Sequence, residues 1–143
     1  MSDVPKVNGQ KVFHAMIQGE PASKANSRRY ALINQQPRFI KSAKALSYAE
    51  VFGYQISKLR REFEPYECDV VFGARIYYGS YRPDLDESLI LDLLQGVAYV
   101  NDRQVKCKLV FHDLDRNSPR SEIIVAPMSS ITDVFDYIYG QGT

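Results

Sequence analysis

Apolar residues at every second position predict the first strand of this chain. Within residues 12–17, Phe13, Ala15 and Ile17 occupy every second position. This spacing is the period of a β-strand. A turn at Gly19-Glu20-Pro21 ends the strand. The preceding residues 1–11 are mostly polar, and we expect a flexible leader there.

A spacing of three and four residues predicts a long helix over residues 43–62. Ser42 is placed to act as its N-cap, and Pro65 follows its end. The apolar stripe of this helix is formed by Leu46, Ala49, Val51, Phe52, Ile56 and Leu59. A second, shorter helix is predicted over residues 88–95, with Gly96 as its C-cap.

Further strands are predicted where apolar residues alternate again, at residues 68–78, 104–111 and 122–125. Residues 23–29 have neither period and are predicted to be a loop, followed by a short extended piece at 37–40. Taken together, these elements predict a single α+β domain with a mixed β-sheet and two main helices. We place the domain at residues 12–125.

The segment 126–143 is expected to be a C-terminal extension. Ile131, Val134, Phe135 and Ile138 follow a helical spacing within it. A short amphipathic helix is therefore expected, which can dock on the sheet or on another subunit.

Charge is balanced overall but not along the chain. Eighteen Lys and Arg residues face seventeen Asp and Glu residues, for a formal charge of +1. Residues 24–44, however, contain six basic residues and no acid: Lys24, Arg28, Arg29, Arg38, Lys41 and Lys44. This segregation makes the segment a candidate surface for DNA.

Cysteine content and hydropathy indicate the cellular compartment of the protein. Cys68 and Cys107 cannot form a disulfide framework for 143 residues, and no cationic and apolar signal segment opens the chain. No apolar run approaches the roughly 20 residues that cross a bilayer. We expect a cytoplasmic protein.

Two aspartates form the most informative polar cluster. Asp84 and Asp86 are separated by one residue, so in an extended chain they point the same way and can share a cation. Pro83 restricts the chain just before them. Mg²⁺ prefers such oxygen ligands. If the helix 88–95 folds back, Asp102 in the following loop can join them.

Simpler explanations exist for the same acids. Asp84 and Asp86 can cap the next helix and favour its dipole, and Asn101-Asp102-Arg103 can be a plain turn. Glu87 is interpreted as a helix-dipole acid and Asp92 as part of a solvated face. His14 and His112 lie in or beside apolar strands and are expected to be structural.

Other chemistries lack their motifs. The sequence contains no Gly-rich phosphate loop, no G-x-S-x-G, no CxxC and no zinc-ligand spacing. An NTPase, a serine hydrolase, a thiol redox enzyme and a zinc protein therefore have no visible basis.

Three sequence blocks resemble the RusA family of Holliday junction resolvases. The first is Gly19-Glu20-Pro21-Ala22-Ser23-Lys24-Ala25-Asn26-Ser27-Arg28-Arg29, similar to a Pro-x-Ser-Lys-x-Asn-x-Arg loop. The second is Arg82-Pro83-Asp84-Leu85-Asp86. The third runs from Leu94 to Val105 and resembles the family's Asp-Asp-x-Gln-Val stretch. Two positions depart from the pattern: Glu87 replaces an Asn, and Ile90 stands where the family has a Lys.

The resemblance implies a homodimeric, Mg²⁺-dependent endodeoxyribonuclease, with Mn²⁺ as an alternative ion, that resolves four-way junctions by paired nicking in DNA recombination and repair. Asp84, Asp86 and Asp102 match the family's metal-binding and catalytic acids. The expected DNA contacts are Lys24, Asn26, Arg28, Arg29, Lys41, Arg82 and Arg103. Tyr77, Tyr78 and Tyr81 are candidates for stacking on exposed bases.

The resemblance also suggests a bacterial or phage-infected cell as the setting. Two other functions remain open from the sequence. One is a nuclease of broader selectivity that cuts flaps or branched DNA. The other is a non-catalytic DNA-binding protein.

Overall fold

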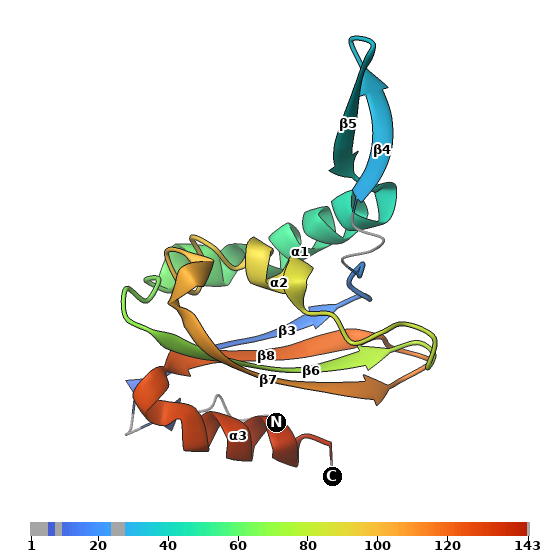
Figure 1. Ribbon diagram of the computed structural model, residues 1–143. Coiled ribbons are helices and arrows are strands. Elements are labelled where there is room, and N and C mark those ends of the chain that lie inside the picture. Colours follow the sequence, from blue (N-terminus) through green and yellow to red (C-terminus); the bar gives the residue numbers. More distant parts are fainter. Residues whose placement is uncertain (1–5, 8–9, 24–27, 143) are drawn as a thin grey trace.

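A mixed four-stranded sheet forms the centre of the computed structural model, which describes residues 6–7, 10–23 and 28–142 (Figure 1). Its strands are β3 (Phe13–Gln18), β6 (Val70–Tyr78), β7 (Val105–Leu114) and β8 (Arg120–Pro127). Their order is β3-β8-β6-β7. Strands β6 and β7 are parallel, and the other neighbours are antiparallel. The predicted α+β class is confirmed.

Helices cover both faces of this sheet. The long helix α1 (Ala43–Glu62) and the short α2 (Ser88–Leu93) lie on one face, and α3 (Ile131–Gly140) lies on the other (Figure 1). Short 3₁₀ helices, η2 (Asp102–Gln104) and η3 (Met128–Ser130), precede β7 and α3. None of the helices in the described part of the chain is long and apolar enough to cross a membrane.

Helix α1 has the predicted bounds. The Ser42 hydroxyl accepts the Ala45 N–H at 3.2 Å, which satisfies a backbone donor of the first turn. Its buried stripe differs from the prediction, because Leu46 and Val51 are exposed. The residues that pack inward are Ala45, Tyr48, Phe52 and Ile56. A single face of the helix can contact the sheet, and the series starting at Ala45 forms it.

Strand β6 is buried on both faces because it lies between two cores. One core, between the sheet and α1 with α2, includes Phe72 and Phe52. The other, between the sheet and α3, includes Val71, Val134 and Ile138. The segment expected as an extension thus contributes a helix to the hydrophobic core of the domain.

An antiparallel hairpin replaces part of the predicted loop 23–29. Strand β4 (Arg28–Ile33) pairs with β5 (Gln36–Lys41), so the expected extended piece 37–40 is correct and its partner strand was missed. Asn34 and Gln35 have φ of 52° and 66°, as a two-residue hairpin turn requires.

Two very short strands also pair within the predicted leader. These are β1 (Lys6–Val7) and β2 (Gln10–Lys11). Part of the segment expected to be a flexible leader therefore has regular backbone structure.

Candidate functional site

A buried phenol holds the backbone between the two predicted metal-binding acids. The Tyr78 hydroxyl donates to the Asp84 carbonyl at 3.2 Å and accepts the Asp86 N–H at 3.2 Å. Tyr78 ends β6, is only 1% exposed and stacks on the ring of His112 at 4.5 Å between centroids. Burial, and then the negative charge nearby, raises the pKa of Tyr78 above its ordinary value. It therefore stays neutral and keeps its proton for donation.

His112 supports the same loop. Its Nε2 lies 3.0 Å from the Pro83 carbonyl oxygen. The loop that carries the acids is thus attached to the sheet through Tyr78 of β6 and His112 of β7. This contact agrees with the prediction that His112 is structural.

The Asp86 carboxylate also acts at the start of α2. Its Oδ1 accepts the Ser88 N–H at 3.0 Å and the Ser88 hydroxyl at 2.5 Å. Asp86 therefore bonds the first residue of α2 from the position before the N-cap residue Glu87, which itself makes no side-chain cap hydrogen bond. A carboxylate has further acceptor sites, so this role does not prevent it from binding a cation.

Asp84 lines a pocket of about 300 Å³ together with two basic residues. The pocket is lined by Pro21, Ser23, Lys44, Tyr78, Arg82, Pro83 and Asp84. Lys44 comes from the first turn of α1, whereas Arg82 and Asp84 come from the loop after β6. Lys44 and Arg82 are side chains that can contact a negatively charged ligand such as a phosphate group, and Lys44 also pairs with the Glu20 carboxylate.

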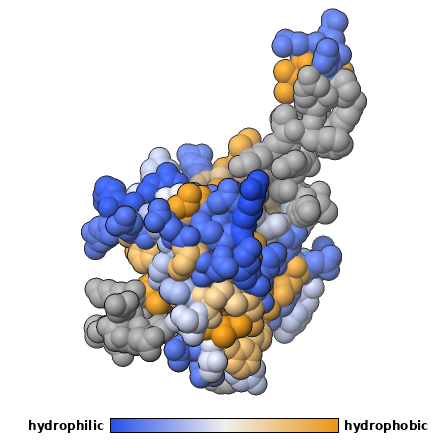
Figure 2. Space-filling model, turned by 60° about the vertical axis from the view of Figure 1, so that its left-hand side comes forward, coloured by the Kyte–Doolittle hydropathy of each residue, from blue (hydrophilic) through white to orange (hydrophobic). Residues whose placement is uncertain are grey.

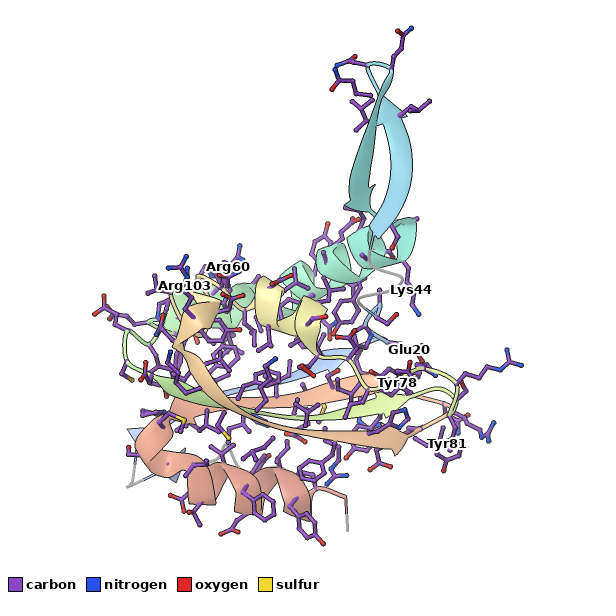
Figure 3. The ribbon with its side chains drawn as sticks, in the orientation of Figure 1. Glu20, Lys44, Arg60, Tyr78, Tyr81 and Arg103 are labelled. Carbon is purple, nitrogen blue, oxygen red and sulfur yellow. The ribbon has the colours of Figure 1, made fainter. Side chains whose placement is uncertain are left out.

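Glu20 connects this pocket to the sheet. Its Oε1 lies 3.5 Å from the Lys44 Nζ, and its Oε2 accepts the Gly79 N–H at 3.0 Å. Figure 3 shows Glu20, Lys44 and Tyr78 at the same end of the molecule, below the first turn of α1. Sequence reasoning missed Glu20 and Lys44 as site residues because only the fold brings them beside Asp84. Their one signal was membership of the basic segment and of the first RusA-like block.

Asp102 lies at the other end of the sheet. It opens η2, just before β7, and its N–H donates to Gln95 Oε1 at 3.2 Å. Val105 pairs with Val70, at the start of β6, whereas Tyr78 ends that strand. Eight residues of strand correspond to roughly 26 Å. Asp102 is therefore separated from the loop that Tyr78 anchors.

The parallel crossover explains this separation. A helix that connects two parallel strands leaves from the end of one strand and returns to the start of the other, so the loops flanking α2 lie at opposite ends of the sheet. Among the described residues, all three aspartates included, no three His, Cys, Asp or Glu side chains are grouped to hold a metal ion. The expected fold-back of the helix does not assemble the three-acid set within one chain.

The predicted DNA contacts are also spread over the molecule. Arg82 lines the pocket, and Arg103 lies beyond the other end of α2, where Figure 3 also draws Arg60. Arg28, Arg29 and Lys41 belong to the hairpin strands β4 and β5.

The remaining two predicted contacts, Lys24 and Asn26, lie outside the described residues.

The three tyrosines expected to stack on bases have different environments. Tyr78 is buried, so that expectation is wrong for it. Tyr77 is half-buried beneath the Arg120 guanidinium, 4.0 Å from its ring centroid. Tyr81 is 73% exposed and remains a candidate for stacking.

His14 is structural, as predicted. Its Nε2 hydrogen-bonds the Glu122 carboxylate, and the Tyr137 hydroxyl from α3 lies 3.2 Å from the same nitrogen. This cluster joins β3, β8 and α3.

Comparisons with known proteins add no family assignment. No protein-family model matches the chain, and no significant match is found among curated proteins. The resemblance to RusA-type resolvases therefore depends on the three sequence blocks alone.

Proposed function

We propose that this protein is a Mg²⁺-dependent, structure-selective endodeoxyribonuclease that acts on branched DNA, with four-way junctions as its preferred substrate. The observation that carries the proposal is the pocket in which Asp84 lies with Lys44 and Arg82. The D-x-D segment is held in place by Tyr78. The three RusA-like blocks support the same activity, and the family pattern implies a homodimer whose twofold symmetry suits a four-way junction.

Asp84 lines the pocket, and Asp86 lies two residues further along the same loop. Mg²⁺ is commonly held by one or two carboxylates together with water and substrate phosphate, and Asp84 and Asp86 are the residues that would hold it. The ion would polarise the phosphate and lower the pKa of a bound water. Lys44 and Arg82 would neutralise phosphate charge. Tyr78 would fix the backbone positions of Asp84 and Asp86.

A nicking assay tests the proposal. A labelled four-way junction, a flap and a linear duplex are incubated with wild type and with Asp84→Asn, with and without Mg²⁺. We expect Mg²⁺-dependent nicking of the junction by wild type and background cleavage by the variant. Asp92→Asn is the matched control, because Asp92 is an exposed acid on α2. Wild type that binds the junction but never cuts it would contradict the proposal.

The position of Asp102 favours a second candidate, a DNA-binding protein without catalysis. No described trio of acids forms a metal site in one chain. The Asp102→Asn variant tests whether nicking requires this third acid. Retained nicking means that the Asp84 and Asp86 pair suffices, whereas lost nicking means that a second subunit supplies Asp102. Absence of nicking in wild type leaves DNA binding as the function.

A further inference from the structure

The hairpin formed by β4 and β5 is a feature that the proposed nuclease site does not use. We call residues 28–41 the arm. Within the described residues, each of its strands pairs only with the other, and neither joins the central sheet. Figure 1 shows the arm extending away from the sheet, beyond the first turn of α1. A hairpin that projects from the sheet in this way is placed to contact a ligand.

The free end of the arm carries two exposed aliphatic side chains. Leu32 is 70% exposed and Ile33 is 45% exposed, immediately before the turn at Asn34 and Gln35. Figure 2 shows hydrophobic atoms beside hydrophilic ones at this end of the molecule. Single exposed aliphatic residues are common. Leu32 and Ile33, however, are consecutive on β4 and therefore point to opposite faces of the hairpin, so an apolar side chain is exposed on each face of its tip.

The charge of the surrounding segment identifies the chemistry of the ligand. No Asp or Glu occurs between Pro21 and Ala49. The arm itself contains four basic residues, Arg28, Arg29, Arg38 and Lys41. A second copy of the arm would bring like charges together, which is unfavourable. A polyanion matches this charge, and a two-stranded ribbon has the width to enter a DNA groove.

We propose that the arm probes DNA and inserts Leu32 and Ile33 at an unstacked base step, such as the branch point of a junction. Aliphatic side chains act in this way in proteins that kink DNA, where they are inserted between neighbouring bases. Basic residues along the arm hold the flanking phosphates. The inference deepens the proposed function, because it takes branched DNA as the ligand and names the element that recognises the branch.

A fluorescence experiment tests the wedge without requiring cleavage. The probes are a four-way junction with 2-aminopurine at the branch point and a linear duplex of the same sequence, both in EDTA. The variant is Leu32→Thr with Ile33→Thr, because threonine keeps the strand preference while removing apolar surface. The matched control is Met16→Thr on β3, since Met16 is similarly exposed at 40%. Circular dichroism verifies that all three proteins are folded.

We expect wild type and Met16→Thr to increase the 2-aminopurine fluorescence on binding. The double variant should lose this increase and about tenfold of its affinity for the junction, with its duplex affinity unchanged. An unchanged fluorescence response and junction preference in the double variant would overturn the inference. So would a change confined to the sedimentation coefficient, because the tip would then be a contact between two copies of the chain.

The outcome is independent of the nicking assay. The wedge can be supported while wild type fails to cut DNA, in which case the nuclease proposal alone fails. Conversely, Asp84-dependent nicking by a protein whose arm variant behaves like wild type supports the nuclease and rejects the wedge.

Discussion

At the scale of single residues, Tyr78 connects the hydrophobic core to the candidate site. One hydroxyl satisfies a carbonyl and an N–H on either side of Leu85, and its ring is buried against His112. A loop without regular structure can hold two carboxylates in register only if its own backbone is bonded to something rigid. Here the rigid partner is a central strand of the sheet.

Replacing Tyr78 with phenylalanine should therefore destabilise the protein by about 0.5–1.5 kcal/mol for each hydrogen bond that is lost, because the two partly buried backbone groups lose this partner. We also expect Mg²⁺-stimulated nicking to need a higher Mg²⁺ concentration, since the two acids lose their anchor. Urea unfolding and a Mg²⁺ titration measure the two effects. The matched control is Tyr81→Phe, at a tyrosine that is 73% exposed. Equal behaviour of the two variants would contradict the anchoring role.

At the scale of elements, α3 packs closely on the sheet at Gly73. A Cβ at this position would lie 2.8 Å from Val134 Cγ1 and 2.9 Å from Ile124 Cγ2. The absence of a side chain at Gly73 on β6 thus allows α3 to approach the sheet. This contact explains why residues after 126 belong to the domain.

Gly73→Ala should destabilise the fold by about 1–3 kcal/mol through overpacking. Gly53→Ala is the matched control, because a Cβ there meets nothing within 4 Å. In the middle of α1 it should stabilise the protein by about 0.5–1 kcal/mol. Thermal unfolding of both variants checks the prediction. It fails if the substitution at Gly73 is neutral.

The His14–Glu122–Tyr137 cluster makes the attachment of α3 sensitive to acid. Burial alone would raise the pKa of Glu122, but the hydrogen bonds and charge of His14, with the Tyr137 hydroxyl and Arg120, hold it below the ordinary value of 4.5. A carboxyl with a lowered pKa in the folded state stabilises the protein at pH above its unfolded value, and the contribution is lost as pH falls through the folded value.

We therefore expect the stability difference between wild type and Glu122→Gln to shrink as the pH falls below 4.5. Urea unfolding midpoints between pH 3 and pH 7 measure this difference. If the stability difference instead grew on acidification, the pKa of Glu122 would be raised in the folded protein and not lowered.

At the scale of the whole molecule, the charge is distributed unevenly despite a net of +1. The basic arm is connected to α1, whose first turn supplies Lys44 to the pocket. DNA held by the arm would therefore pass near the loop that carries Asp84. Binding through such contacts depends on the release of counterions from phosphates.

Arg38→Gln on the arm should lower the slope of log affinity against log salt concentration by about 0.9, the value for one phosphate contact with duplex DNA. Arg116→Gln, at an exposed arginine in the turn between β7 and β8, should leave the slope unchanged. Fluorescence anisotropy over a range of salt concentrations measures both. Identical slopes for the two variants would exclude an electrostatic role of the arm.

Local signals in the sequence were sufficient for most elements. The cap at Ser42, the spacing along α1 and the alternation in β3 and β6 are properties of neighbouring residues, and each predicted an element close to the observed one. The D-x-D segment was likewise visible, because its two acids are separated by a single residue. By itself, the sequence determined these elements and the presence of an acidic pair.

Only the tertiary structure decided how distant segments meet. Strand β6 lies between β7 and β8, and its parallel pairing with β7 places Asp102 at the end of the sheet opposite the loop after β6. The same packing brings Lys44 and Glu20 to that loop. Strand pairing depends on contacts between residues far apart in the chain, and spacing along the sequence does not encode which strands become neighbours.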